Sequence, residues 1–339
     1  MDIAELETLA RAAGFDAMGV APAVRAPHAN TFHAWLGEGM HASMDWLARD
    51  PEGRCRPDVA LTGARSVIAL GMNYFLPDAP VPEDGVARGR IARYARGRDY
   101  HHLIRKRLRQ LDRALAAEGG TQRCFVDSGP LLERDFAVLA GIAWHGKSTL
   151  ALHPKLGTWF LLAAVVTTLE IAPTPPLRER CGSCTRCITA CPTGAIVEPY
   201  KVDARKCISY WTIEHKGPLP EWLRPLLGDR IFGCDDCLDA CPWNRFAKAA
   251  RESDFQARPA SQWTLRDYLS LDEESFKKLF EGSPIRRAKR QGFLRNVCTA
   301  LGNVGTAGDL PALEKAQADP DAIVSEHAAW AIEKIRSRS

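Results

Sequence analysis

The chain has 339 residues, of which 46% are hydrophobic and 25% are charged, and its formal net charge is +4. This composition is ordinary for a soluble globular protein of two or three domains, and the weak net charge does not identify a partner by itself. The first residues are acidic where a signal peptide would be basic, and the longest apolar run, 159–166, is far shorter than the roughly 20 residues of a membrane span, so we expect a cytoplasmic protein without membrane contact.

The first part of the chain predicts a domain that mixes helices with strands. Apolar residues recur at helical spacing in two long segments, and short runs rich in branched residues lie between them. This alternation indicates an α+β or α/β domain. The predicted helices are 2–13 and 101–118, and the predicted strands are 66–72, 122–126 and 158–168.

Two literal motif matches in this region lack the context that their functions require. Residues 141–148, GIAWHGKS, match the phosphate-binding pattern G-x-x-x-x-G-K-[ST], but the preceding segment 131–140 has helical periodicity where a strand is required. Pro154 would also stop the following helix almost at once, so we do not expect nucleotide hydrolysis. Residues 99–104, DYHHLI, lack the glycine of a corrinoid-ligating D-x-H-x-x-G pattern, and His101 is interpreted as a surface or packing residue.

Cysteine spacing in the middle of the chain predicts two iron–sulfur clusters. The stretch CGSCTRCITACP, which begins at Cys181, follows C-x2-C-x2-C-x3-C-P, the spacing of bacterial two-cluster ferredoxins, whose fourth thiolate binds the other cluster. A second set lies in CDDCLDACPW, where Ile231 occupies the position of the leading cysteine and Cys207 is its natural replacement. Crossed ligation therefore predicts one cluster held by Cys181, Cys184, Cys187 and Cys241, and another held by Cys191, Cys207, Cys234 and Cys237.

A pair of zinc sites is the alternative, because C-x2-C also opens zinc ribbons. Zinc does not need the third thiol of the first set or the C-x3-C-P endings, so iron–sulfur is favoured. Disulfides are not expected, because the cytoplasm keeps thiols reduced. The three remaining cysteines are interpreted as small buried hydrophobes: Cys55, Cys124 and Cys298.

The last part of the chain predicts short helices and contains few cysteines. The pattern from 294 to 335 is typical of paired-helix repeats of the HEAT kind. Only one or two such units are present. The predicted helices are 265–269, 272–280, 287–302, 310–319 and 323–335.

A basic run at 286–295, RRAKRQGFLR, has five cations and no acid. A solvated helix face is one interpretation of such a run. The run follows EGSP, which predicts a helix N-cap, and the helix dipole does not favour cations at that end. A phosphate-binding surface for nucleic acid is therefore favoured, with the candidate contacts Arg286, Arg287, Lys289, Arg290 and Arg295.

Several of these stretches together resemble the epoxyqueuosine reductase family. The resemblance rests on VDSGPLLERDFA, GKSTL, the first cysteine set, CISYWTIEHKGPLP, CDDCLDACPWN and EGSPIRRAKRQGFLRNVCTALGN, and it covers nearly the whole chain from about Gly14. It implies an α+β multidomain protein with three parts. These are a reductive-dehalogenase-like α/β corrinoid-binding domain at 1–172, a ferredoxin-like module with two [4Fe-4S] clusters at 173–246, and HEAT-like helices that hold tRNA at 247–339.

The resemblance also implies an activity, its cofactors and its partners. The family reduces epoxyqueuosine in tRNA to queuosine with base-off cobalamin, which receives electrons through the two clusters. The expected partners are tRNA that carries epoxyqueuosine at the anticodon and an external low-potential electron donor, and the protein is expected to be a monomer. A base-off corrin needs no histidine ligand, which fits the incomplete D-x-H pattern.

By resemblance, the family's proton donor falls on Asp127, which follows a predicted strand and precedes a turn. Without the resemblance, an ordinary turn or cap aspartate would be the simpler interpretation. Further candidates could contact the corrin or line the gap between the corrin and a cluster. These candidates are Tyr94, Arg134, Lys147, Ser148, Ser209 and Tyr210.

Two other functions use the same cysteine pattern. A reductive dehalogenase would act on a small molecule with the same cofactors, but such proteins usually carry an export signal and have no use for a basic helical tail. A two-cluster ferredoxin would only carry electrons. It would leave more than 170 residues before the cysteines unexplained.

Overall fold

The computed structural model describes residues 1–78, 80, 82, 84–127 and 129–338. Its N-terminal part is built on a four-stranded sheet in the order β1-β2-β7-β4, in which all neighbouring strands are antiparallel. Antiparallel pairing corrects the α/β expectation, which implies a mostly parallel sheet, and makes this part α+β. The strands of the sheet are β1 (Ala17–Pro22), β2 (Ser66–Asn73), β7 (Phe160–Thr167) and β4 (Gln122–Phe125).

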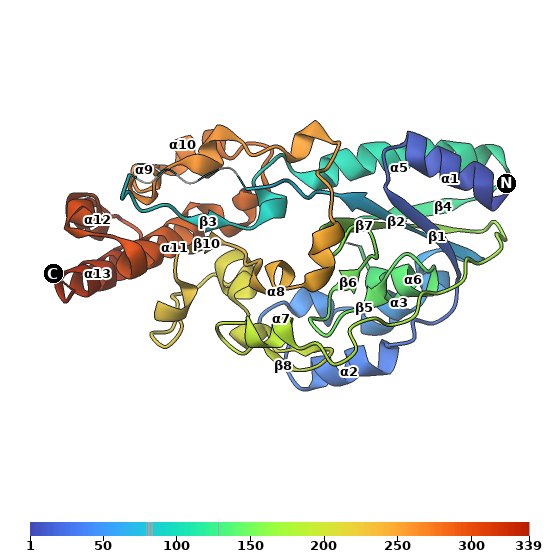
Figure 1. Ribbon diagram of the computed structural model, residues 1–339, viewed down its shortest axis with the longest axis horizontal. Coiled ribbons are helices and arrows are strands. Elements are labelled where there is room, and N and C mark those ends of the chain that lie inside the picture. Colours follow the sequence, from blue (N-terminus) through green and yellow to red (C-terminus); the bar gives the residue numbers. More distant parts are fainter. Residues whose placement is uncertain (79, 81, 83, 128, 339) are drawn as a thin grey trace.

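Helices cover both faces of this sheet (Figure 1), and for that reason all eight residues of the central strand β2 are buried. The three predicted strands are confirmed as β2, β7 and β4. Strand β1 was not predicted. It pairs with β2 from Ala17 opposite Gly71 to Pro22 opposite Ser66. Its Gly and Pro residues are poor strand formers, so pairing with β2 decides its conformation.

On one face lie α1 (Ile3–Ala12) and α5 (Tyr100–Ala117), above the sheet in Figure 1. Helix α1 begins at a capping box formed by Asp2 and Glu5. The buried residues of α5 recur every three or four positions, and they pack with α1 and with β2 in one core. The helices predicted at 2–13 and 101–118 are thus confirmed.

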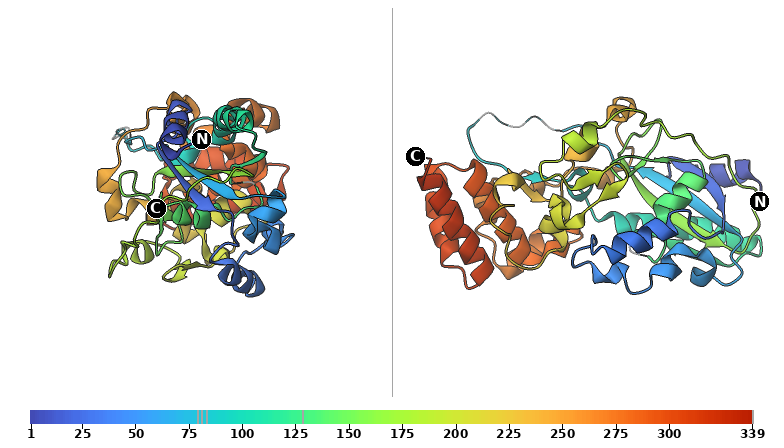
Figure 2. Two further views of the ribbon diagram at one scale, coloured as in Figure 1. Left: turned by 90° about the vertical axis from the view of Figure 1, so that its right-hand side faces the viewer. Right: turned by 90° about the horizontal axis from the view of Figure 1, so that it is seen from below.

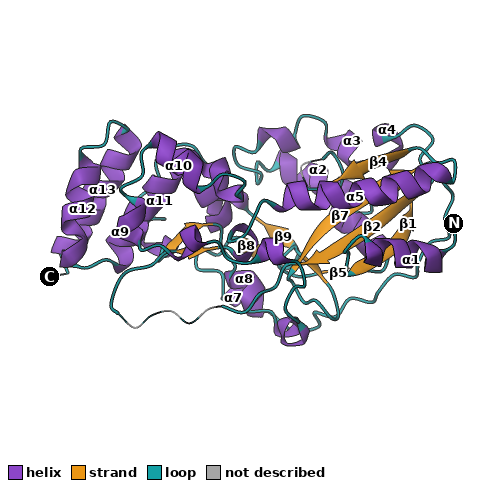
Figure 3. Cartoon of the chain, turned by 90° about the horizontal axis from the view of Figure 1, so that it is seen from above, coloured by secondary structure: helices purple, strands orange, loops and turns teal. Residues whose placement is uncertain are grey.

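The other face carries short helices and a small hairpin, which lie below the sheet in Figure 1, whereas Figure 3 views the sheet from the side of α5. Helix α6 lies against the sheet through Phe136 and Ala137, which pack with Val67 and Ala164. The segment predicted to be helical at 131–140 is this helix. The elements on this side are α2 (Ala29–Gly37), α3 (Pro51–Cys55), α4 (Pro57–Ala60), α6 (Glu133–Leu139), β5 (Trp144–His145) and β6 (Ala151–Leu152).

The cysteine-rich segment consists of short elements in the middle of the molecule (Figure 1). These are α7 (Arg186–Thr189), β8 (Ile196–Glu198), β9 (Lys201–Val202), β10 (Arg230–Phe232) and α8 (Asp236–Asp239). Strand β3 (Arg90–Ile91) pairs with β10 in parallel. Residues before the predicted boundary at 172 therefore belong structurally to the middle of the molecule.

The C-terminal helices lie at the end of the molecule opposite the N-terminus (Figure 2). Their core also contains Ile91, Ile231 and Phe232, which joins them to β3 and β10. Helices α11, α12 and α13 pack together as predicted, but nothing identifies them as HEAT repeats. The helices are α9 (Leu265–Tyr268), α10 (Glu273–Leu279), α11 (Lys289–Val304), α12 (Leu310–Gln317) and α13 (Ala322–Arg336). Within the described residues, every helix is too short or too polar to cross a bilayer.

Candidate functional site

The eight cysteines of the predicted clusters fall into two groups of neighbours. The pKa of the Cys241 thiol is raised to about 11, chiefly by burial and then by the charges of Cys181, Cys187 and Cys184. The pKa of the Cys237 thiol is raised well above its ordinary value, chiefly by burial and then by the charges of its neighbours. These neighbours are Cys207, Cys234 and Cys191, which form the second group with Cys237. These are the same two groups of four that crossed ligation predicts.

The separation of the sulfur atoms distinguishes an iron–sulfur cluster from zinc. Four thiolates on one zinc ion, each at about 2.3 Å, would be about 3.8 Å apart. Among the described residues, some groups of three or more possible ligand atoms lie within 4.8 Å of one another. None of these groups contains any of the eight cysteines. No three of these sulfur atoms therefore lie close enough together for a closed zinc tetrahedron, whereas a cubane holds its thiolates farther apart.

A cavity of about 70 Å³ lies at the first group of cysteines. Cys181, Cys184, Cys187 and Cys241 all line it, and Lys147 and Ser148 form part of its wall. The Lys147 Nζ donates to the Gly182 carbonyl at 2.5 Å. These two candidate corrin contacts therefore belong to the surroundings of the first cysteine group.

Asp127 lies at the centre of a hydrogen-bonded network. It follows β4 with a φ of +35°, in the left-handed region, and its side chain is 46% exposed. Its carboxylate accepts hydrogen bonds from the Tyr100 hydroxyl and from Nε2 of His101, the latter at 2.7 Å. The other imidazole nitrogen of His101 contacts Asp99 Oδ1, also at 2.7 Å. The backbone N–H of Asp127 donates to Glu133 Oε1 at 2.9 Å.

This network holds protons that are available near neutral pH. Burial lowers the pKa of His101, but the hydrogen bonds to Asp127 and Asp99 outweigh it and raise the pKa to about 9. Burial, followed by the charge of Asp127, raises the pKa of Glu133 to about 8. At pH 7 the imidazole of His101 is therefore a cation between two carboxylates, and Glu133 retains its proton. The arrangement can deliver a proton at the Asp127 carboxylate.

The other candidate corrin contacts are divided between two places. The ring of Tyr94 lies 5.9 Å from that of Tyr100, edge to face, and so borders the Asp127 network. Arg134, beside Glu133 on α6, donates to the Thr149 carbonyl at 2.5 Å. The remaining two follow Cys207. Ser209 donates to the Cys234 carbonyl at 3.5 Å, and the buried Tyr210 hydroxyl is 2.7 Å from Ser43 Oγ.

The basic run does not form one surface. Arg295 is only 1% exposed, and its guanidinium donates to the carbonyls of Trp211, His215 and Gly217. Arg290 pairs with Asp319, and its Nε donates to a backbone carbonyl at 2.7 Å. Both guanidinium groups are occupied inside the protein, so the expectation that they contact tRNA is corrected. Arg286, Arg287 and Lys289 are exposed.

Sequence reasoning misses two functional candidates. His101, interpreted from the sequence as a surface or packing residue, contacts Asp127 and so belongs to the network. Lys216 is exposed, and its Nζ donates to the Arg287 carbonyl at 3.0 Å. Its position in TIEHKGP, one of the stretches that carry the resemblance, was the available signal. We call Lys216, Arg286, Arg287 and Lys289 the basic face.

The basic face lies within electrostatic range of Asp127. The hydrogen bond from Arg287 to Glu214 chiefly raises the pKa of Arg287, and the charge of Asp127 adds to the rise, which indicates that Arg287 and Asp127 lie near each other.

Of the three isolated cysteines, Cys55 and Cys298 are buried as predicted. Cys124 is exposed, which corrects its prediction, because it lies on the edge strand β4.

Two families match parts of the chain. Residues 180–244 match the family described as 4Fe-4S double cluster binding domain, and residues 54–128 match the one described as Epoxyqueuosine reductase QueG, DUF1730. The epoxyqueuosine reductase of Xanthomonas campestris pv. campestris is 43% identical over 336 residues, which cover 97% of this chain and 95% of that protein. The Escherichia coli (strain K12) epoxyqueuosine reductase is 41% identical over 324 residues, which cover 94% of this chain and 86% of that protein.

Solved structures of epoxyqueuosine reductase share the whole fold. A crystal structure with a tRNA-Tyr epoxyqueuosine-modified stem loop superposes with a TM-score of 0.92 at 31% identity, covering 98% of this chain and 89% of that one. The Bacillus subtilis enzyme, with its catalytic aspartate loop swung out of the active site, superposes with a TM-score of 0.90 at 30% identity, covering 98% and 90%. A reductive dehalogenase aligns with a TM-score of only 0.42, too low to support the expected likeness.

Proposed function

This chain belongs to the epoxyqueuosine reductase family, and we propose that it removes the epoxide oxygen of epoxyqueuosine in tRNA. Both carbon–oxygen bonds of the epoxide break, a carbon–carbon double bond forms, and the oxygen leaves as water. The reaction consumes two electrons and two protons. The observation that carries the proposal is that one molecule contains three features together. These are the hydrogen-bonded network around Asp127, the two groups of four cysteines and the exposed basic face.

Two [4Fe-4S] clusters fit the cysteine groups. The double-cluster family match covers all eight thiols, and their sulfur atoms are too far apart for a zinc tetrahedron. In our assignment Cys241 completes the first group and Cys207 completes the second. When bound, the clusters would supply single electrons.

A base-off cobalamin is the proposed site of reduction, and the residues present fit such a group. The nearby His101 is held between Asp99 and Asp127, so it is engaged elsewhere and does not serve as a metal ligand. Tyr94 borders the Asp127 network through its contact with the Tyr100 ring, and burial, followed by the charges of Asp235 and Asp127, raises its pKa. When bound, the corrin would supply a strongly reducing cobalt centre.

Proton delivery is the part of the reaction that this chain's own residues perform. The Asp127 carboxylate accepts hydrogen bonds from Tyr100 and His101, so it must gain a proton before it can donate one to the leaving oxygen. His101 is positioned to supply that proton through Nε2, and Asp99 stabilises the imidazolium from the other side. Glu133 fixes the backbone of Asp127. Asp127 is thus proposed as the catalytic acid, with His101 as its proton source.

The basic face is the proposed binding surface for the tRNA backbone. Exposed lysine and arginine side chains neutralise phosphates and release counterions. The proximity of Arg287 to Asp127 would bring a bound anticodon loop to the acid. We further propose that the enzyme acts as a cytoplasmic monomer and takes electrons from an external low-potential donor.

The experiment is anaerobic turnover of epoxyqueuosine-tRNA by reconstituted protein, with and without added cobalamin, under a strong chemical reductant. Asp127→Asn keeps the shape of the side chain but has no acidic proton. We expect it to retain iron, corrin and tRNA binding while turnover drops by about 10²–10⁴-fold. Turnover that does not depend on cobalamin, or near wild-type turnover by the variant, would reject the corresponding part of the proposal.

A further inference from the structure

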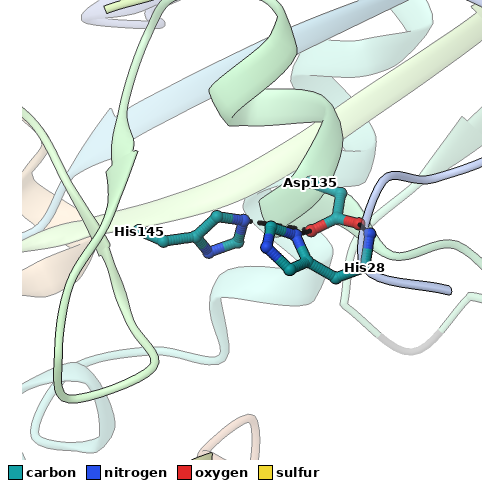
Figure 4. A group of neighbouring side chains, drawn as sticks. All are labelled: His28, Asp135 and His145. Carbon is teal, nitrogen blue, oxygen red and sulfur yellow. Dashed lines mark hydrogen bonds and ion pairs between the residues drawn. The ribbon is translucent and has the colours of Figure 1, made fainter. Parts of the chain in front are cut away.

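A cluster of two imidazoles and one carboxylate lies apart from the cysteines and from the Asp127 network. It joins His28, at the start of α2, Asp135 on α6 and His145 on β5. In Figure 4 both imidazole rings point toward the Asp135 carboxylate. The three ligand atoms all lie within 4.8 Å of one another. None of the functions described above uses them.

The distances suit a single metal ion. His28 Nδ1 is 2.9 Å from Asp135 Oδ1, and His145 Nε2 is 3.0 Å from the same oxygen. Two ligands that lie about 2.05 Å from a tetrahedral ion are about 3.3 Å apart, so each nitrogen would move only by about a few tenths of an ångström to admit the ion. Two imidazoles and a carboxylate form the donor set of one class of catalytic zinc sites and of non-haem iron sites, both of which keep open positions.

Charge and access also favour a cation. The Asp135 side chain is only 4% exposed, and a buried carboxylate needs a positive partner. In the described part of the chain its ion-pair partners are two imidazoles, which are neutral unless protonated. The backbone N–H of His28 donates to Asp135 Oδ2 at 2.9 Å and so orients the carboxylate from outside the candidate ligand set. His28 is 54% exposed, which gives an ion a path from solvent.

A second cluster in the chain shows the contrast. His33, Glu52 and Cys55 also lie within 4.8 Å of one another. There, however, Arg25 donates to both oxygens of Glu52, at 2.9 and 3.0 Å, and supplies the positive charge. The Glu52 cluster therefore has no need of a metal ion and serves as a matched control.

We propose that His28, Asp135 and His145 bind one divalent transition-metal ion of the zinc class. The ion would join the start of α2 to α6 and β5, and His28 precedes Asp135 by 107 positions in the sequence. His145 directly precedes Gly146, Lys147 and Ser148, which line the cavity of the first cysteine group, so the ion would brace one wall of that cavity.

The test uses anaerobically reconstituted protein dialysed against chelator-buffered Zn²⁺, with zinc and iron measured by mass spectrometry. We expect about one zinc per chain at unchanged iron, and a zinc absorption edge with nitrogen and oxygen ligands at about 2.0–2.1 Å. His28→Gln should weaken zinc binding by more than about 100-fold, which is more than the loss of a hydrogen-bond partner outside the ligand set would cause. The control variant His33→Gln should leave zinc binding unchanged. His145→Gln provides a second ligand variant.

Three results would overturn the proposal. A zinc shell with sulfur at about 2.3 Å would place the ion on the cysteines. Equal zinc affinity in His28→Gln and in the wild type would place it elsewhere on the surface. Absence of bound zinc would leave Asp135 as a carboxylate that shares a proton with the two imidazoles.

Discussion

The proposed proton source can be tested by His101→Gln. Glutamine keeps a hydrogen-bonding side chain at this position but cannot carry the positive charge that Asp127 and Asp99 share. General acid–base groups typically contribute about 10²–10⁴-fold in rate, so we expect turnover to drop by at least about 10²-fold with normal tRNA affinity. His102→Gln is the matched control, because His102 is an exposed neighbour on the same helix.

The pH dependence follows from the raised pKa of His101. In the wild type, single-turnover rates under a chemical reductant should fall as pH rises through about 9, the pKa of His101 in the folded protein. Folding stability should follow the same sign, because a pKa raised by folding stabilises the protein below the ordinary value of 6.5, and this stabilisation is lost as pH rises through about 9. At about 1.36 kcal/mol per pKa unit, the rise corresponds to on the order of 3 kcal/mol.

The assay is rapid-quench turnover of epoxyqueuosine-tRNA from about pH 6 to about pH 10, together with denaturant unfolding over the same range. In His101→Gln the fall near pH 9 should vanish from both measurements. A variant with near wild-type turnover and an unchanged pH profile would refute the role of His101. It would leave Tyr100, which also donates to Asp127, as the proton source to examine.

Three further predictions test the remaining parts of the proposal. Cys207→Ala should reduce the bound iron from about eight to about four atoms, because Cys207 completes only one of the two cubanes. Elemental analysis measures the iron, and full iron content in the variant would contradict the crossed assignment. Replacing Arg286 and Arg287 with Gln should weaken tRNA binding and lower the log–log salt slope by about one per lost phosphate contact, whereas an unchanged slope would mark a plain solvated surface. Arg295→Met should lower the free energy of unfolding, because at least three backbone carbonyls lose their donor, and should leave the salt slope unchanged.

Features that depend on local spacing could be predicted from the sequence, and the cysteines are the clearest case. The three helices at the sheet and the strands β2, β4 and β7 followed from periodicity in the same way. Crossed ligation required one step more, because Cys207 lies outside the repeat and only the gap at Ile231 pointed to it. Strand β1 could not be found, since its residues have low strand propensity and pairing with β2 decides its conformation.

Features that depend on tertiary contacts were missed or misjudged. His101 acquires its role from Asp127, which lies 26 positions away in sequence and reaches it only because β4 ends beside the start of α5. In the basic run, composition does not separate Arg286 from Arg295. The first is exposed before α11, whereas the second lies within a stretch of α11 that is buried on all sides, 292–302. Burial of that arginine depends on carbonyl groups of a distant loop, which the run itself does not reveal.

That loop joins the proposed second cluster to the proposed tRNA-binding face. The segment 207–217 begins at Cys207, passes through a π-helical turn at Tyr210–Glu214 and ends beside the basic face. Helix α11 fixes it through Arg295, and Asn296 Nδ2 donates to the Thr212 carbonyl at 2.9 Å. A single-turn π-helix is uncommon and often marks a functional site. Because one buried helix holds residues 211–217 of this segment, the proposed basic face is anchored a few residues after Cys207, and tRNA bound there would lie close in the chain to the proposed second cluster.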